Sequence, residues 1–161
     1  MILIKIWFHI MALLKKIFYE VIYRKKLKIG KKVTWRRDFL LMIESNAKVI
    51  IGDECFFNNG CTIGANKEVM IGEGTIFGEN VKIYDHNHRF ANVEKSIKDQ
   101  GFSNGMVKIG NHCWIGSNVC ILKNSEIGDN CVIGAGCVIS GKISSNTIVK
   151  IDTSKQVEVL Y

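Results

Sequence analysis

A parallel β-solenoid with a triangular cross-section is the fold class that the sequence predicts, and two observations predict it. From Ile51 onward the chain divides into groups of six residues, beginning with "IGDECF", "FNNGCT" and "IGANKE". The 161 residues also include 15 glycines and no proline, and glycine permits the positive φ that a tight corner needs. A repeat of fixed length is the usual sequence mark of stacked structural units.

These six-residue groups, called hexads below, give each position a constant role. The first position is Ile or Phe in nearly every copy, the second is usually Gly, and the fifth is small or β-branched. The first and fifth side chains are expected to point inward from a short strand. Three hexads close one coil of about 18 residues, which stacks Ile109 over Ile127 and Ile115 over Ile133. A sandwich of short strands is the alternative, but seven consecutive hexads from residue 109 keep strict phase, which argues against it.

The cysteines follow the hexads. Five of the six occupy the fifth position, namely Cys55, Cys61, Cys113, Cys131 and Cys137. The chain contains neither a CxxC pair nor a zinc-ligand spacing. We therefore expect small buried thiols in the reducing cytoplasm, and neither disulfides nor a metal site.

Positive charge is concentrated at the start of the chain. Residues 1–37 carry a net charge of +10, whereas the remaining 124 residues carry −3. Basicity is thus a property of the N-terminal segment. A nucleic-acid groove along the body of the protein is not expected.

Residues 1–28 are predicted to form a basic amphipathic helix. Its seam is spaced 4-3-4-3-4 and comprises Leu3, Trp7, Ile10, Leu14, Ile17 and Val21, with Lys5, His9, Lys15 and Lys16 away from it. The apolar run is too short to span a bilayer, and no cleavable signal is recognised. Two interpretations remain open, a helix buried against the coils and its oligomer mates, and a helix lying on an anionic membrane surface.

The hexads break at "YDHNHRF". They run to His88 and restart at Ile109, so residues 89–108 form a loop that is expected to project from a corner of the solenoid. His86 and His88 are expected on the last regular side before it. Because imidazole titrates near neutral pH, either ring could act as a general base. Asp85 or Asn87 could then hold its tautomer.

The pattern over about residues 29–150 resembles the hexapeptide-repeat acyltransferases, and "VKIGNHCWIGSNVCILKNSEIGDNCVIGAGCVIS" is especially close to their C-terminal coils. The resemblance implies a left-handed parallel β-helix. It also implies a homotrimer that transfers an acetyl group from acetyl-CoA to a hydroxyl of a sugar, as in sugar and polysaccharide O-acetyltransferases. "NHR" matches the family pattern at His88, which is the preferred base, and His86 is the second choice.

The resemblance also implies a cofactor groove. Trp114 in "WIG" corresponds to a tryptophan beside the catalytic cleft, or else covers a subunit interface. Ser117 in "WIGSN" and Ala135 in "IGAGC" are expected to line the pantetheine arm, although simple corner packing would explain Ala135 equally well. The family's "GNPAK"-like ending is replaced by "NTIVKIDTSKQVEVLY". Lys150 or Lys155 is the candidate for a CoA phosphate, with solvated lysines as the alternative.

The expected organisation is a basic helix over 1–28, a β-helix over 29–150 with the projecting loop 89–108, and a tail over 151–161. The expected acceptor is a sugar of a bacterial surface polysaccharide, modified in the cytoplasm or at the inner face of the membrane. Two other functions are compatible with the coils. One is a non-catalytic scaffold. The other is a zinc-dependent carbonic anhydrase-like trimer using His86, His88 and His112, whose H-x-H-x23-H spacing does not match.

Overall fold

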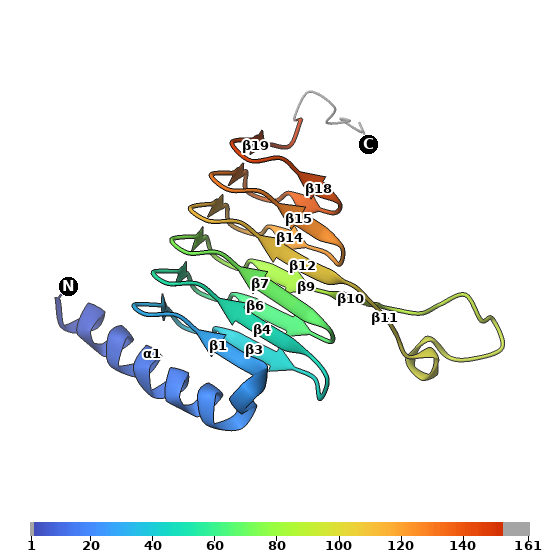
Figure 1. The fold of residues 1–161 in the computed structure, drawn as a ribbon, viewed down its shortest axis with the longest axis horizontal. Helices are drawn as coiled ribbons and strands as arrows, with labels where there is room; N and C mark the ends of the chain where they lie inside the picture. The colour runs from blue at the N-terminus through green and yellow to red at the C-terminus, as the bar shows by residue number, and fades with distance from the viewer. Residues whose placement is uncertain (1, 153–161) are drawn as a thin grey trace, which may run out of the picture.

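The computed structural model describes residues 2–152, and for residues 2–5 only the course of the backbone. It consists of one α-helix at the end of a β-solenoid of about six turns, from which a single hairpin projects (Figure 1). The expected fold class, a left-handed parallel β-helix with an N-terminal helix, is confirmed. Lys155 and the expected tail beyond residue 152 lie outside the described residues.

Successive coils add one strand each to three sheets. The first sheet contains β1 (Leu27–Ile29), β4 (Lys48–Ile51), β7 (Glu68–Ile71), β12 (Met106–Ile109), β15 (Ser125–Ile127) and β18 (Lys142–Ile143). The second contains β2 (Thr34–Trp35), β5 (Phe56–Phe57), β8 (Ile76–Phe77), β13 (Trp114–Ile115), β16 (Val132–Ile133) and β19 (Ile148–Val149). The third contains β3 (Leu40–Ile43), β6 (Thr62–Ala65), β9 (Lys82–Tyr84), β14 (Cys120–Ile121) and β17 (Val138–Ile139).

The stacking expected from the hexads is confirmed. All strand pairs within the three sheets are parallel, with Ile109 beside Ile127 and Ile115 beside Ile133. The buried side chains form columns along the solenoid axis. One column is aromatic, because the rings of Phe39 and Phe57 lie 4.8 Å apart and those of Phe57 and Phe77 lie 4.4 Å apart. Inward-pointing residues therefore form one continuous core.

The glycines at the second hexad position have a different role from the expected one. Positive φ falls two residues later, for example at Lys32, Glu54 and Asn118. The second-position glycines instead lie where successive coils nearly touch. A Cβ at Gly110 would stand 2.5 Å from the carbonyl carbon of Gly128. Glycine is required there because no side-chain atom fits between two backbones.

The cysteines behave as the hexads predicted. All six are free thiols, and all but Cys120 are buried. Four of them donate a hydrogen bond from Sγ to a carbonyl oxygen of the next coil, as Cys55 does to Gly72 at 3.0 Å. Burial raises the pKa of the Cys55 thiol to about 11, so the neutral, unreactive form is favoured.

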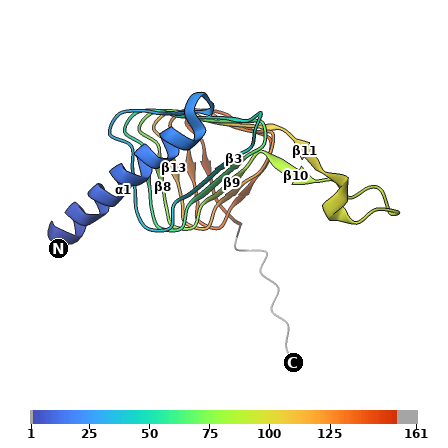
Figure 2. The same cartoon turned by 90° about the horizontal axis from the view of Figure 1, so that it is seen from below.

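Helix α1 (Ile2–Tyr23) covers the open end of the solenoid, followed by a single 3-10 turn, η1 (Arg24–Lys26) (Figure 2). It satisfies backbone groups of the first coil that have no further coil to pair with. The Tyr19 hydroxyl donates to the carbonyl of Phe39 and accepts from the amide of Leu41, both at 3.2 Å. Lys16 donates to the carbonyl of Gly30 at 2.9 Å. The helix thus blocks an edge that would otherwise invite further strand pairing.

The face of α1 that packs on the coil is not the predicted seam. Ala12 and Tyr19 are buried, whereas the described seam residues are exposed, with Trp7 at 58% and Val21 at 65%. Within one chain the helix therefore packs on the coil through Ala12 and Tyr19, and the seam stays exposed. The physical reason is that the coil end offers unpaired carbonyls, which select the side of the helix that carries hydrogen-bond donors. No described helix is long and apolar enough to cross a membrane.

We predict that Gly110→Ala lowers the free energy of unfolding by about 2 to 3 kcal/mol, because the new Cβ forces two coils apart. Gly134→Ala is the matched control, since it holds the same hexad position but its Cβ would meet its nearest atom, the carbonyl oxygen of Val149, at 3.1 Å. Urea unfolding should rank the first variant well below the second. Equal losses would show that coil spacing is not what selects glycine.

Candidate active site

One residue, Asp85, separates β9 from the first strand of the projecting hairpin. Its two strands, β10 (His86–His88) and β11 (Phe102–Asn104), pair antiparallel, with His86 opposite Asn104 and His88 opposite Phe102. Between them lies a short 3-10 turn, η2 (Ile97–Gln100). The expected position of the histidines on the last regular side is therefore wrong. The coil ends at Tyr84, and both histidines belong to β10, which lies on the projecting hairpin (Figure 1).

Asp85 connects the end of the coil, at Tyr84, to the first strand of the hairpin, and it is called the joint below. Its side chain is fully buried, and it accepts hydrogen bonds from the amides of Asn66 and Lys67, both at 2.7 Å. His86 Nδ1 lies 3.0 Å from Asp85 Oδ1. A carboxylate can only accept, so this contact selects the tautomer with the proton on Nδ1. Asp85 thus holds His86, and not His88, in place.

The two histidines differ in access. The side chain of His86 is 20% exposed, and its ring lies edge-on to Phe102 with centroids 5.2 Å apart. His88 is exposed, and its ring centroid lies 4.4 Å from that of Phe102, its partner across the strand pair. A general base must reach a substrate proton. Geometry therefore favours His88 for contact with an acceptor and His86 for anchoring the hairpin.

A cavity of about 500 Å³ opens beside His88. Polar and cationic residues dominate its lining, which includes Asn87, Arg89, Asn92, Lys95, Asp99, Gln100, Ser103 and Lys123. Lys123 belongs to the next coil, and its Nζ donates to Ser103 Oγ at 2.6 Å. Lys123 was not among the predicted site residues. It lies 18 residues, or one coil, after Gly105, where the hairpin rejoins the stack, and this spacing could have identified it.

The candidate cofactor residues lie elsewhere. Trp114 points outward from the second sheet between Ile76 and Val132, and it is 56% exposed. Ser117 and Ala135 follow this sheet at the corner toward the third sheet. The carbonyl of Ser117 accepts from the amide of Gly136 at 2.9 Å, which places the two turns one coil apart as expected.

Lys150 is exposed and follows β19, where it lies beside Gly134, one residue out of register with Ser117 and Ala135. Ser117, Ala135 and Lys150 therefore lie at the corner that follows the second sheet, where the strands of the third sheet begin. His86 and His88 lie beyond the other end of these strands, after β9. The structure brings the two sets into separate groups within one chain.

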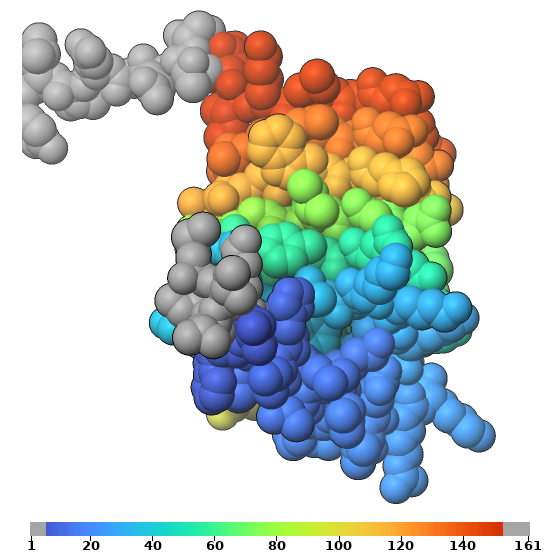
Figure 3. Space-filling view, turned by 90° about the vertical axis from the view of Figure 1, so that its left-hand side faces the viewer, coloured from blue at the N-terminus to red at the C-terminus, as the bar shows by residue number. Residues whose placement is uncertain are grey.

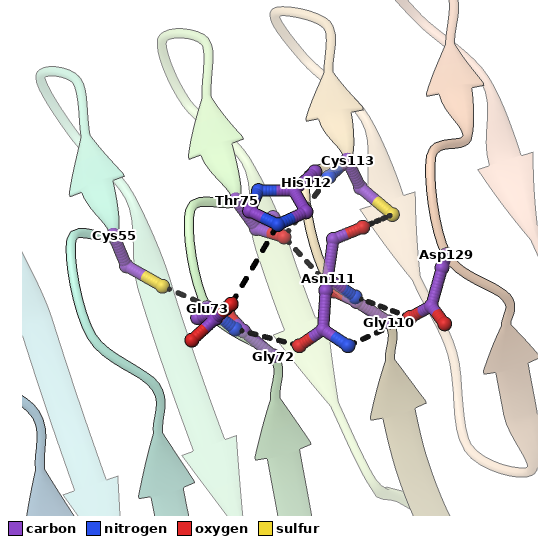
Figure 4. A network of polar contacts seen from close by, with 9 residues as sticks. All are labelled: Cys55, Gly72, Glu73, Thr75, Gly110, Asn111, His112, Cys113 and Asp129. Atoms are coloured by element: carbon purple, nitrogen blue, oxygen red, sulfur yellow. Dashed lines mark hydrogen bonds and ion pairs between the residues drawn. The ribbon is translucent and has the colours of Figure 1, made fainter.

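His112 is separate from both groups. It follows β12 at the corner between the first and second sheets, and its Nε2 lies 3.6 Å from Glu73 Oε1 (Figure 4). Around it, Asn111 accepts from the amide of Glu73 at 2.9 Å and donates its own amide to Asp129 at 2.6 Å. This network fastens successive coils at their corners. Among residues 2–152 no three His, Cys, Asp or Glu side chains gather as metal ligands.

Comparison with known proteins agrees with this architecture. Residues 106–141 match the family model "Bacterial transferase hexapeptide (six repeats)". The repeat continues in register on both sides of the matched segment. Residues 106–141 thus carry the hexapeptide repeat that this family model describes.

Two curated proteins and one solved structure are similar to this chain. A putative lipopolysaccharide biosynthesis O-acetyl transferase of Escherichia coli K12 is 30% identical over 63% of this chain and 55% of its own length. The galactoside O-acetyltransferase of the same organism is 26% identical over 83% of this chain and 71% of its own. A solved galactoside acetyltransferase in complex with coenzyme A superimposes with a TM-score of 0.69 at 28% identity, over 80% of this chain and 63% of that one. The chain spans about half the length of several curated relatives that it matches.

We predict that Asp85→Asn destabilises the protein by about 2 kcal/mol, because an amide group cannot accept from all three donors that now surround the carboxylate. Hydrogen exchange should quicken at the amides of Asn66 and Lys67, and urea unfolding should shift. Asp99→Asn is the control, since that carboxylate accepts only an exposed contact from Ser96. Unchanged exchange at residues 66 and 67 would contradict the role of Asp85 as the joint.

Proposed function

We propose that this chain is an acetyl-CoA-dependent O-acetyltransferase that modifies a hydroxyl of a sugar, and that His88 is its general base. The observation that carries the proposal is the exposed His88 ring at the wall of a polar cavity, on a hairpin that the coil stack holds rigidly through Asp85. Similarity to galactoside O-acetyltransferase over most of the chain supports the reaction type.

The reaction requires one proton carrier. The acceptor hydroxyl gives its proton to the imidazole of His88, and its oxygen attacks the thioester carbonyl of acetyl-CoA. The tetrahedral intermediate collapses with cleavage of the C–S bond. The sulfur of CoA leaves and takes the proton back from the imidazolium, so the base is restored. Asp85 and His86 act by positioning the strand that carries His88.

A sugar is the acceptor that the cavity fits best. Its lining offers amide, hydroxyl and carboxylate groups, from Asn92, Gln100, Ser103 and Asp99, which suit hydroxyl-rich ligands. Phe102 supplies the flat apolar surface behind His88. A role in a bacterial surface polysaccharide is our extension, supported by the name of the similar Escherichia coli transferase.

We further propose a homotrimer whose sites lie between subunits. The two groups of candidate residues lie at opposite ends of the strands of the third sheet, so a single chain does not bring them into one site. The outward residues of the second sheet are apolar, as at Ile76, Trp114 and Ile148, whereas the first sheet is outwardly charged, as at Lys108 and Glu126. A threefold assembly would bury the apolar faces and bring His88 of one chain toward Ser117 and Ala135 of another.

Residues 1–28 are proposed to touch a membrane surface, with the enzyme working on its cytoplasmic side. The support is the exposed seam of α1 together with the net charge of +10 over residues 1–37. An apolar face beside basic side chains suits the interface of an anionic bilayer. This placement would keep the free thiols in a reducing compartment.

We predict that His88→Ala lowers kcat/KM for acetyl transfer by about 10²- to 10⁴-fold while CoA binding, measured by calorimetry, is retained. Transfer from isotope-labelled acetyl-CoA to a panel of glycans is the assay. His112→Ala is the matched control, an exposed histidine at another corner. Undiminished turnover in His88→Ala would remove His88 as the base, and the same result in His86→Ala would remove the pair.

The scaffold alternative has its own outcome in the same assay. A chain that binds no CoA up to millimolar concentration, and transfers no acetyl group to any glycan, would be a non-catalytic member of the family. Such a result would overturn the enzyme proposal as a whole.

We predict that the 18.2 kDa chain sediments as a trimer in mild detergent, and that two inactive variants complement each other. His88→Ala lacks the base, and Ser117→Trp obstructs the groove. If each site takes its base from one chain and its groove from the next, random mixed trimers regain about a quarter of the wild-type sites. A monomer with full activity, or mixed trimers without activity, would contradict the shared site.

A further inference from the structure

A cavity of about 430 Å³ lies between the first half of α1 and the corner that follows β2. Trp7, Phe8, Met11, Leu14 and Phe18 line it from the helix, and Trp35 lines it from the coil. Figure 3 shows this end of the molecule, where the helix (dark blue) lies against the first coil (light blue). The cavity is continuous with the exposed seam, since Trp7 and Leu14 belong to both. Most of the residues that line it from the helix are apolar.

Positive charge surrounds this apolar cavity. Lys15, Arg36 and Arg37 line it against a single carboxylate, Asp38. Arg36 donates to Asn58 at 3.3 Å, and the guanidinium of Arg37 lies 5.3 Å from the ring of Phe8. Within residues 2–152 neither arginine forms an ion pair with a carboxylate. Both therefore keep donors for an anion, and arginine suits a phosphate in particular.

Trp35 supplies a second, independent observation. Its side chain is buried, and its indole N–H has no hydrogen-bond acceptor among the described residues. A buried donor without a partner costs free energy. The other core residues of this coil, such as Phe39 and Leu41, carry no polar side-chain group. The coil side of the cavity thus includes a residue with an unsatisfied polar donor, in addition to the charged side chains that line it.

We propose that this cavity binds one anionic phospholipid of the membrane surface, with an acyl chain among the aromatic side chains and the phosphate at Arg36 and Arg37. The inference rests on the proposed membrane contact of α1 and deepens it, because it replaces a diffuse basic patch by a defined site. A second copy of the chain fits less well. The chain itself carries a net charge of +7, so another copy complements these arginines less well than an anionic lipid does.

Fluorescence quenching tests the site directly. Trp7 and Trp35 line the cavity, and Trp114 is replaced by Phe to silence it. Phosphatidylglycerol with brominated acyl chains, presented in vesicles with phosphatidylcholine, should quench the remaining emission in a saturable manner. Unbrominated lipid should compete for the site. Vesicles of phosphatidylcholine alone should have little effect, since they carry no net negative charge.

The arginines are tested against a matched pair. Arg36→Gln with Arg37→Gln should weaken phosphatidylglycerol binding about 30-fold, as expected for two basic contacts. Lys25→Gln with Lys28→Gln removes the same charge from exposed positions outside the cavity lining. Its effect should be smaller by about a factor of ten. Far-UV circular dichroism checks that both pairs keep the fold.

The outcomes separate the two proposals. Equal weakening by both pairs, with quenching that does not saturate, overturns the lipid site and leaves general membrane contact standing. Absence of vesicle binding by the wild type overturns both. Burial of the seam in the trimer, with no quenching by brominated lipid, would assign the cavity to a second copy and likewise overturn the inference.

Discussion

The close approach of successive coils at their corners is the constraint on which the rest of the structure depends. Parallel strands one coil apart must keep hydrogen-bonding distance all the way around the turn, so the backbone at the corner leaves no room for a Cβ. This explains why glycine recurs at the second hexad position although its φ there is ordinary. It also explains the small fifth residue, where the Cys55 thiol reaches the carbonyl of the neighbouring coil.

So regular a stack needs a place where the chain can leave it without weakening it. Asp85 provides it. The residue ends the coil, and its buried carboxylate accepts from two backbone amides that a continuing coil would otherwise have to satisfy. The chain can then cross into an antiparallel hairpin and return at Met106 in register with β7. The rigidity of the coil is transmitted to His88 by this joint.

The two ends and three faces of the solenoid differ in chemistry. The first end is closed by donors from α1, such as Tyr19 and Lys16, which leaves the apolar side of the helix outward. The outward second sheet is apolar and the first is charged. Contacts with other subunits and with lipid therefore have separate surfaces available, and neither competes with the hairpin for space.

Much of this protein was determined by the sequence alone. The hexads predicted the solenoid, its inward columns and the buried thiols, because a six-residue period places the same hexad positions inward in every coil. The interruption before Ile109 predicted a projecting segment, but both histidines were expected on the coil, whereas they lie on the hairpin strand β10. Local pattern could not decide which histidine meets Asp85, because that contact depends on where the coil ends and the antiparallel pair begins. Nor could it show that α1 packs through Ala12 and Tyr19. Periodicity shows which face of the helix is apolar. The face that packs was decided by the unpaired backbone groups of the first coil, because these become visible only in the tertiary structure.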